Sequence, residues 1–520
     1  MVPSWLHNAI FYEIYPPSFF DSNGDGIGDI NGIRQKLAYV KSLGCNALWL
    51  NPCFDSPFKD GGYDVRDFKK VAPRYGTNEE IAALFEEAHK MGIRVLLDLV
   101  ICHSSEEHPW FVQSCKAKAN EYTGRYIWTG LCFDDGDGMP FVGGESERSA
   151  TYIISFFKCQ PALNFGYHNI RRHWQQPIDS PDALATQEAM MDVMRFWLKM
   201  GCDGFRVDMA GNLVKNDPDH IGTTAVWRRM LSAIKQEFPE AAFVSEWSEP
   251  EKSLSCGFDM DFFLGWPFDG YNTMIRNYDT DPQGRLTSSN DAYFVADSSQ
   301  DVQAFLADYV PVYEKFKDRG YWCLTTGNHD VLRPTVTLSE RELCLCYGWI
   351  LTMPGAPYIY YGDEIGMRWL DLPTKEGGYY RTGSRTPMQW DHSKNMGFSN
   401  AESGKLYLPQ DPNTDAPTVA SQEENPTSLL NTVRQLTTLR HQYPQLQNSG
   451  SFEVFSAVPG SKLFAYKRGD LLVSMNPGIK ECTLPLDRDY EILFSIGSTE
   501  IARSTLFLGA QSLAVLIPKA

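Results

Sequence analysis

The strongest constraint on the fold of this 520-residue chain is a regular alternation of short apolar segments with amphipathic ones. Eight segments have the length and the β-branched and aromatic content of buried strands: 9–16, 47–52, 94–100, 204–209, 243–247, 259–265, 323–330 and 357–364. Helical patterns lie between them, for example at 78–92 and 186–201, and both end in a glycine, a common helix terminator. Eight strands alternating with helices predict an α/β chain folded as a (β/α)8 TIM barrel.

Two parts of the chain depart from this rhythm. The interval between the third strand and the helix at 186–201 contains the glycine- and aspartate-rich stretch 132–149, which predicts a subdomain inserted after strand 3 at 104–167. After 448, short apolar segments alternate with turn residues, which predicts a C-terminal antiparallel β-sandwich domain at 449–520. The barrel is therefore expected to comprise 1–103 and 168–448.

Charge and composition exclude several classes of partner. The net charge of −18 repels phosphate backbones and argues against nucleic-acid binding. No apolar run approaches the roughly 20 residues that span a bilayer, so no membrane partner is expected. The first residues lack the features of a leader peptide, which predicts a cytoplasmic protein. The twelve cysteines form no CxxC pair, which predicts that they are reduced, packed thiols and not zinc ligands. The chain can be a monomer or a homo-oligomer.

Polar side chains cluster where the predicted strands end. The active site of a (β/α)8 enzyme lies at the carboxyl ends of its strands, so these side chains are expected to converge on one mouth. They are Asp98 and His103 after strand 3, Arg206 and Asp208 at strand 4, Glu246 at strand 5, and His329 and Asp330 at strand 7.

Arg206 and Asp208 stand two positions apart in an apolar segment and would share one face of a strand. One interpretation is a buried ion pair, which by itself is weak evidence of function. The other is an active site, in which Arg206 keeps Asp208 ionised as a nucleophile. Glycoside hydrolysis needs two facing carboxylates, one that attacks and one that donates a proton. The convergence of carboxylates favours the second interpretation.

Five motifs carry a resemblance to a known family: DLVICH (98–103), QPALN (160–164), GFRVD (204–208), SEW (245–247) and GNHD (327–330). In this order and spacing the chain resembles the α-amylase family of glycoside hydrolases over essentially its full length. The resemblance implies that Asp208 is the nucleophile, Glu246 the acid/base and Asp330 the transition-state stabiliser. It also implies that His103, Arg206 and His329 bind the reacting sugar and that Tyr63 stacks on it.

The stretch DSNGDGIGD (21–29) is similar to half of a calcium-binding loop. Oxygen-bearing side chains are separated by glycines, although a solvated turn would have the same composition. Family members with this loop bind calcium there, so the resemblance implies a structural Ca²⁺ ion. Its ligands would be Asp21, Asn23, Asp25, the Ile27 carbonyl and Asp29.

RTPMQW (385–390) resembles the exo-acting branch of the family, which includes oligo-1,6-glucosidase and trehalose synthase. Asp60 matches a carboxylate that closes the sugar pocket in that branch, although a simple turn residue would fit equally well. Some relatives pair this carboxylate with an arginine before the last barrel helix, but 421–428 contains none.

Three departures from the family pattern bear on ligands and linkage. Cys102 replaces the usual asparagine ligand of a second calcium, so that site is not expected. Ala162 and Met209 replace residues typical of α-1,6-specific members, which favours α-1,4 linkages and leaves α-1,6 open.

The expected function is a retaining α-glucosidase that cleaves short malto- or isomalto-oligosaccharides, its small-molecule partners, at the non-reducing end. The main alternative is a transglycosylase or isomerase, such as trehalose synthase or a sucrose-active enzyme. An endo-acting amylase or cyclomaltodextrinase and a non-catalytic binding homologue are less favoured.

Overall fold

A computed structural model describes residues 2–265, 268–282, 285–377 and 380–519. Its centre is an eight-stranded sheet with the order β13-β10-β9-β8-β5-β2-β1-β14, whose neighbouring strands are all parallel. A parallel bridge from Thr325 to Tyr358 joins the two outermost strands and closes the sheet into the predicted barrel. The strands are β1 (Phe11–Ile14), β2 (Ala47–Leu50), β5 (Arg94–Leu99), β8 (Gly204–Val207), β9 (Ala242–Ser245), β10 (Met260–Phe262), β13 (Tyr321–Cys323) and β14 (Tyr358–Tyr360).

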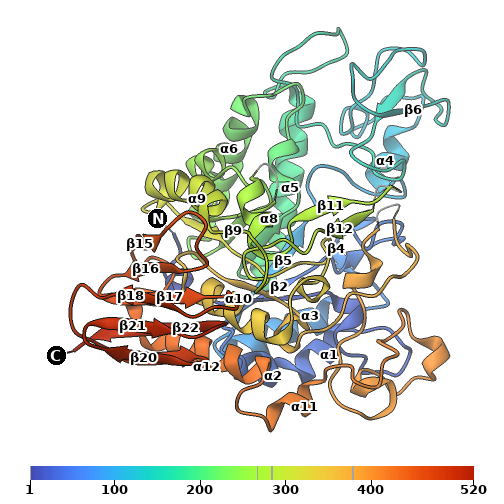
Figure 1. Ribbon diagram of the computed structural model, residues 1–520. Coiled ribbons are helices and arrows are strands. Elements are labelled where there is room, and N and C mark those ends of the chain that lie inside the picture. The colour runs from blue at the N-terminus through green and yellow to red at the C-terminus, as the bar shows by residue number, and fades with distance from the viewer. Residues whose placement is uncertain (1, 266–267, 283–284, 378–379, 520) are drawn as a thin grey trace.

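Helices surround the barrel (Figure 1). They are α1 (Ile30–Gln35), α2 (Leu37–Ser42), α3 (Asn78–Lys90), α5 (Pro181–Met200), α6 (Ile221–Glu237), α7 (Pro250–Ser253), α8 (Asp269–Ile275), α9 (Gln303–Phe316), α10 (Glu340–Thr352), α11 (Val419–Glu423) and α12 (Leu429–Gln442). Local sequence sets their ends: Thr77 and Glu80 form a capping box at the start of α3, and α5 ends at Gly201 in a left-handed conformation.

The barrel strands are shorter than the apolar segments that predicted them. The seventh segment was expected at 323–330, whereas β13 ends at Cys323. The chain beyond it is a loop that carries His329 and Asp330. Similarly, β8 ends at Val207, and Met209 takes a positive φ of 45°. Asp98 and Arg206 lie within their strands, whereas Asp208 and Glu246 lie one residue beyond β8 and β9. The backbone N–H groups of these two residues still donate to the neighbouring strands, at the Leu99 and Val207 carbonyls.

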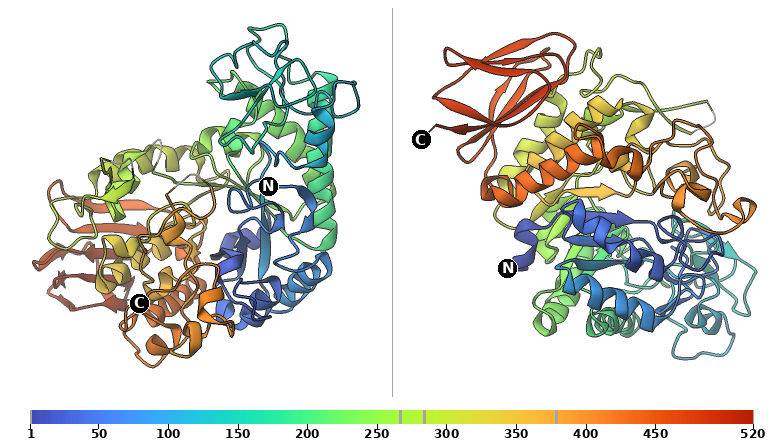
Figure 2. Two further views of the ribbon diagram at one scale, coloured as in Figure 1. Left: turned by 90° about the vertical axis from the view of Figure 1, so that its right-hand side faces the viewer. Right: turned by 90° about the horizontal axis from the view of Figure 1, so that it is seen from below.

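The insertion after β5 and the C-terminal segment lie far apart on the barrel. Between β5 and α5 the chain forms α4 (Pro109–Ser114) and the hairpin β6 (Phe141–Gly143) and β7 (Thr151–Ile153). The remaining pairs are β3 (Phe54–Asp55) with β4 (Asp67–Val71), and β11 (Tyr278–Thr280) with β12 (Leu286–Ser288). Both views of Figure 2 place the red C-terminal strands on the opposite side from the teal insertion.

The C-terminal segment consists of two antiparallel sheets, as predicted. One has the order β15-β16-β17-β22-β19 and the other β18-β21-β20. The strands are β15 (Glu453–Ala457), β16 (Phe464–Arg468), β17 (Leu471–Asn476), β18 (Cys482–Pro485), β19 (Tyr490–Ile496), β20 (Thr499–Ala502), β21 (Thr505–Leu508) and β22 (Ser512–Pro518). Apolar side chains of the first sheet belong to the same buried cluster as the barrel helices, so the two domains share one core. In the described part of the chain, no helix is long and apolar enough to cross a membrane.

Candidate active site

The guanidinium of Arg206 lies at the centre of a cluster of carboxylates at the carboxyl end of the barrel. Its Nη1 is 2.8 Å from Asp98 Oδ1 and 3.1 Å from Asp208 Oδ1, and its Nη2 is 2.7 Å from Glu246 Oε2. The Arg206 side chain is only 2% exposed, so water screens these interactions little. One cation thus holds three carboxylates that arrive from three neighbouring strands.

Asp208 and Glu246 share this guanidinium and line the same cavity. Glu246 Oε2 also accepts a hydrogen bond of 3.1 Å from the Met209 backbone N–H, which the turn after Asp208 directs at it. Burial raises the pKa of Asp208 well above its usual range. Arg206 opposes this shift, and the charges of Glu246 and Asp98 add to it. The net shift is upward, so Asp208 binds a proton more readily than an exposed aspartate does.

Asp330 lies in a different electrostatic environment. Its Oδ1 accepts hydrogen bonds from Arg381 Nη1 at 2.6 Å and Arg385 Nη2 at 2.8 Å, and its Oδ2 lies 3.2 Å from His329 Nε2. Burial would raise the pKa of Asp330, but the positive charges of Arg381, His329 and Arg385 outweigh it and hold that pKa well below its usual range. Asp330 is therefore ionised at neutral pH.

His329 connects Asp330 to the barrel wall. Its Nδ1 is 2.8 Å from Glu13 Oε1, on β1, and its Nε2 is 2.6 Å from the Tyr63 hydroxyl. Burial lowers the pKa of His329, but the carboxylates of Asp330 and Glu13 more than compensate and raise it to about 9. The ring of Tyr63 lies parallel to that of His329, with centroids 5.4 Å apart, and its hydroxyl also donates to Asp98 at 2.9 Å.

His103 is the neutral histidine of the site. Burial lowers its pKa to about 4. Its Nε2 lies 2.9 Å from the Tyr63 carbonyl oxygen. Its buried Nδ1 has no hydrogen-bond partner within the described residues, and the side chain lines the cavity. A neutral imidazole with a free nitrogen is suited to a sugar hydroxyl.

The predicted site residues line one cavity of about 340 Å³. Asp60, Tyr63, His103, Asp208, Glu246 and Asp330 all contribute, together with Arg381 and the aromatic rings of Phe156 and Phe157 from the insertion. Arg206 and His329 lie behind this lining and contact it as described above. The structure therefore brings together every residue that the sequence assigned to catalysis and sugar binding.

Arg381 was not predicted, and it lines the cavity. It donates to Asp60 Oδ1 through Nη2 and to Asp330 Oδ1 through Nη1. It stands outside 421–428, where the family resemblance placed the partner of Asp60, and lies four residues before RTPMQW, which is the signal in the sequence that could have identified it. Two glycines with positive φ allow the close approach, because a β-carbon would lie 2.6 Å from Arg385 Nη1 at Gly61 and 2.7 Å from Asp60 Oδ1 at Gly377.

Comparisons with known proteins agree with this geometry. The family model "Alpha amylase, catalytic domain" matches residues 13–449. The chain belongs to the alpha-amylase family. Eight parallel strands, the insertion after the third and the C-terminal sheets are the architecture expected of it, and the chain is an enzyme that acts on α-glucosidic bonds.

Relatives with different names are about equally similar. The trehalose synthase/amylase TreS of Mycobacterium tuberculosis is 31% identical over 94% of this chain and 84% of its own length. The oligo-1,6-glucosidase of Heyndrickxia coagulans is also 31% identical, over 97% of both chains. Among solved structures, a variant of the trehalulose synthase MutB in complex with Tris superposes with a TM-score of 0.82 at 25% identity, covering 99% of this chain and 100% of its own.

The loop at 21–29 is folded around two inward-facing carboxylates. Asp21 accepts hydrogen bonds from the backbone N–H groups of Asn23, Gly24 and Gly26. Asp29 caps α1 by accepting a hydrogen bond from the Gly32 N–H. The side chains of Asn23 and Asp25 are exposed. Within the described ranges, no group of three or more His, Cys, Asp or Glu side chains is placed to hold a metal ion. The oxygen donors suit calcium in type, but in this structure they are not gathered around one point.

An ammonium group, that of Lys215, lies near Cys102. Cys102 Sγ lies 3.4 Å from the Met209 carbonyl, and Lys215 Nζ donates to the Asn212 carbonyl at 2.7 Å. The charges of Lys215 and Cys102 are close enough to affect the pKa of each other. A lysine thus supplies the positive charge beside the insertion.

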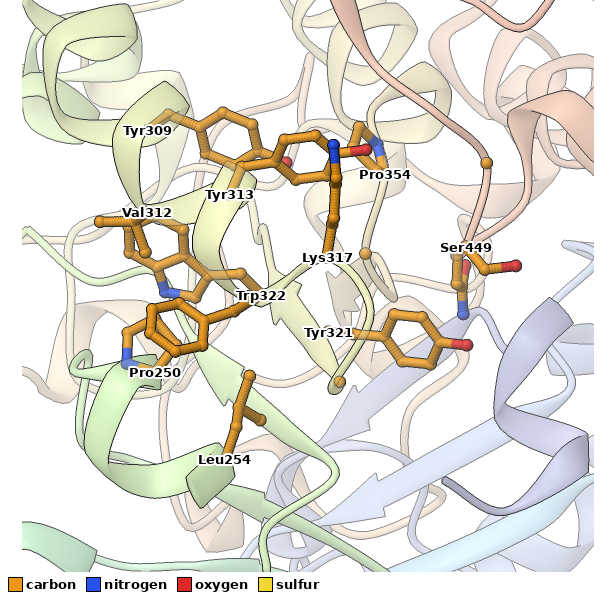
Figure 3. A pocket seen from close by; sticks show the side chains of 15 residues that line it. Pro250, Leu254, Tyr309, Val312, Tyr313, Lys317, Tyr321, Trp322, Pro354 and Ser449 are labelled. Atoms are coloured by element: carbon orange, nitrogen blue, oxygen red, sulfur yellow. The ribbon is translucent and has the colours of Figure 1, made fainter. Parts of the chain in front are cut away.

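A separate pocket at the opposite end of the barrel is not a sugar site. Figure 3 shows its aromatic lining, in which Tyr309, Tyr313 and Trp322 stand close to Pro250 and Leu254. Its lining includes Tyr321, the first residue of β13, so it lies at the amino ends of the strands, away from the carboxylates. Its volume of about 20 Å³ holds little more than a water molecule.

The ionisation of His329 predicts a pH-dependent contribution to stability. The unfolded histidine has a pKa near 6.5, whereas that of folded His329 is about 9. Because the folded pKa is the higher, the stabilisation is complete below about pH 6.5 and is lost as the pH rises through 9. Thermal unfolding of the wild type and of His329→Gln should therefore differ most near about pH 6 and converge above about pH 9. A difference in Tm that does not change over this range would contradict the assigned ionisation.

Proposed function

We propose that the protein is an exo-acting, retaining α-glucosidase that releases glucose from the non-reducing ends of short oligosaccharides, with α-1,4 linkages favoured and α-1,6 possible. The observation that carries this proposal is the bridge from Asp60 through Arg381 to Asp330. The three residues line a cavity whose volume of about 340 Å³ is near the lower end of the range for ligand pockets, and we infer that their bridge closes one end of it. A closed end admits a chain terminus and excludes the middle of a polymer.

The residues of the cavity support a two-step displacement. In the first step a carboxylate oxygen of Asp208 attacks the anomeric carbon while Glu246 transfers its proton to the departing glycosidic oxygen. This step forms a glucosyl ester and releases the shortened sugar. In the second, Glu246 takes a proton from water, whose oxygen displaces Asp208 and gives glucose with the original configuration. The ionised Asp330 stabilises the positive charge that develops on the sugar ring in both steps.

Glucose release by the purified protein tests the reaction. Maltose, maltotriose, isomaltose, sucrose and trehalose are incubated with the wild type and with Asp208→Asn. The wild type should release glucose rapidly from maltose or maltotriose, and the variant should be slower by roughly 10³-fold or more because it lacks the nucleophile. If a correctly folded wild type releases glucose from none of them, the proposed hydrolysis is wrong.

Removal of Arg381 tests the closed end of the cavity. Arg381→Ala leaves Asp60 and Asp330 facing each other without their shared cation, so kcat/KM for maltose should fall by roughly 10²-fold, an effect of the size expected for a lost buried charge contact. Arg368→Ala is the matched control, because Arg368 pairs with Asp411 and Asp415 at the surface. Equal kcat/KM values for both variants would show that the bridge does not shape the sugar site.

An isomerase is the second candidate, favoured by the names of the relatives. The trehalose synthase/amylase TreS is as similar to this chain in sequence as the oligo-1,6-glucosidase is, and the trehalulose synthase MutB superposes with a TM-score of 0.82. An isomerase would use the same glucosyl-enzyme but return the leaving sugar to it in a new linkage before water arrives. In the same incubations, conversion of maltose to another disaccharide in excess over glucose would favour this alternative.

We also propose that the loop at 21–29 binds a structural Ca²⁺ ion. Asp21, Asn23, Asp25, Asp29 and the Ile27 carbonyl would supply its oxygen ligands. Two carboxylates face inward here, and burial together with the charge of Asp21 raises the pKa of Asp29, so a cation nearby would relieve their repulsion.

The calcium proposal predicts stabilisation by the ion. At about 100 times its Kd, Ca²⁺ should increase the free energy of unfolding by about 2.7 kcal/mol and raise Tm accordingly. Asp25→Asn removes an exposed ligand and leaves the hydrogen bonds of Asp21 in place, so it should weaken this response while Tm without Ca²⁺ stays nearly constant. If millimolar Ca²⁺ does not change Tm or give a binding heat in calorimetry, the loop is held by its backbone hydrogen bonds alone.

A further inference from the structure

Asp261, on β10, is a buried carboxylate with no place in the proposed chemistry, and all its hydrogen bonds go to the segment around Glu246. Its Oδ1 accepts from Ser245 Oγ at 2.8 Å, from the Trp247 N–H at 3.2 Å and from the Ser248 N–H at 3.0 Å. Its Oδ2 accepts from the Glu249 N–H at 2.9 Å and from Ser253 Oγ at 2.9 Å. The side chain is fully buried and forms no ion pair within the described residues.

These donors belong to the residues immediately before and after Glu246. The three consecutive N–H groups of 247–249 converge on one carboxylate, which fixes the path of the chain as it leaves β9. This path is unfavourable in isolation, because Ser248 has a φ of 60° in the left-handed region. The Ser248 hydroxyl also accepts the Leu264 N–H at 3.1 Å, so β10 and the turn hold each other in place.

On the β8 side, the backbone N–H of Glu246 donates to the Val207 carbonyl at 3.0 Å. Its side chain reaches Arg206 and the Met209 N–H, both on the β8 side of the cavity. The backbone from which it projects is fixed on the other side by the contacts of Asp261. Proton transfer to a leaving oxygen requires the donor within hydrogen-bond distance and correctly oriented, so a small shift of this turn would misplace the carboxyl.

We infer that Asp261 is a positioning residue for the acid/base Glu246: it organises the turn at 247–249 and so directs the proton donor at the leaving group. This inference rests on the proposed role of Glu246 in the two-step displacement. Asp259, which lies two residues earlier in the chain, has different partners. Asp259 pairs with Lys235 at 2.6 Å and accepts the Phe243 N–H at 2.9 Å, and among the described residues its side chain has no hydrogen bond to 245–249.

Substrates that differ in the leaving group distinguish positioning from a general loss of structure. A sugar leaving group needs a proton as the glycosidic bond breaks, whereas fluoride departs from α-glucosyl fluoride without one. The parameter kcat/KM reports only the steps up to the formation of the glucosyl-enzyme, so the later activation of water does not enter it. A misplaced acid therefore lowers kcat/KM for maltose and affects the fluoride much less.

The experiment compares Asp261→Asn, Asp259→Asn and Glu246→Gln with the wild type on maltose and α-glucosyl fluoride, with Tm measured for each. Asparagine has the shape of aspartate, but an NH₂ group replaces one of its two acceptor oxygens. This group cannot accept from the N–H and hydroxyl donors that face it, so the turn at 247–249 loses some of its hydrogen bonds. For Asp261→Asn, kcat/KM for maltose should fall roughly 10- to 100-fold further than that for the fluoride, the same direction as in Glu246→Gln. Asp259→Asn should lower Tm and leave the ratio of the two kcat/KM values unchanged.

Two results would overturn the inference, and they are distinct from failure of the proposed function. An equal loss on both substrates in Asp261→Asn would show that Asp261 supports the fold only. If Asp261→Asn has a lowered Tm, like Asp259→Asn, but unchanged kcat/KM values for maltose and α-glucosyl fluoride, then the turn does not position Glu246. A wild type inactive on both substrates would instead refute the proposed function itself, and the positioning role with it.

Discussion

The whole active site depends on one buried cation. Arg206 holds Asp98, Asp208 and Glu246 at distances between 2.7 and 3.1 Å, in a place where almost no water reaches its side chain. Removing the guanidinium would leave three carboxyls without their shared counter-charge in a medium of low dielectric constant, which is costly. The barrel makes the arrangement possible, because three adjacent parallel strands end at the same edge and deliver one carboxylate each. The cluster thereby brings the two carboxyls of the proposed chemistry, Asp208 and Glu246, to one shared cation.

A second set of contacts defines the size of the site. Asp60 follows β2, Asp330 follows β13, and Arg381 follows β14, so three loops distant in sequence meet at one end of the cavity. Asp330 is held ionised by this arginine together with Arg385 and His329, whereas burial and negative neighbours raise the pKa of Asp208. The pKa values of two carboxyls in one cavity are thus shifted in opposite directions, and the arginine that lowers one of them also lines the cavity.

The sequence predicted the barrel and the site because both depend on local patterns. Apolar segments of strand length alternate with helices, and the polar residues directly after them, such as Asp208 and Glu246, must converge once the strands are parallel. Partners that depend on the path of a loop were not predictable. Arg381 reaches Asp60 only because glycines at 61 and 377 let two loops approach each other, and no periodicity records that. The role of Asp261 was hidden for a similar reason, since its partners are backbone N–H groups that exist in every sequence.

The central claim is that Asp208, held by Arg206, forms a covalent bond to glucose. The most direct test is mass spectrometry of the protein after incubation with a fluorinated α-glucosyl fluoride that forms the glucosyl-enzyme quickly and loses it slowly. The account predicts one added sugar per chain, located by peptide mapping on Asp208, and none on Asp208→Asn. A label on another carboxylate, or hydrolysis that inverts the anomeric configuration without any label, would contradict it.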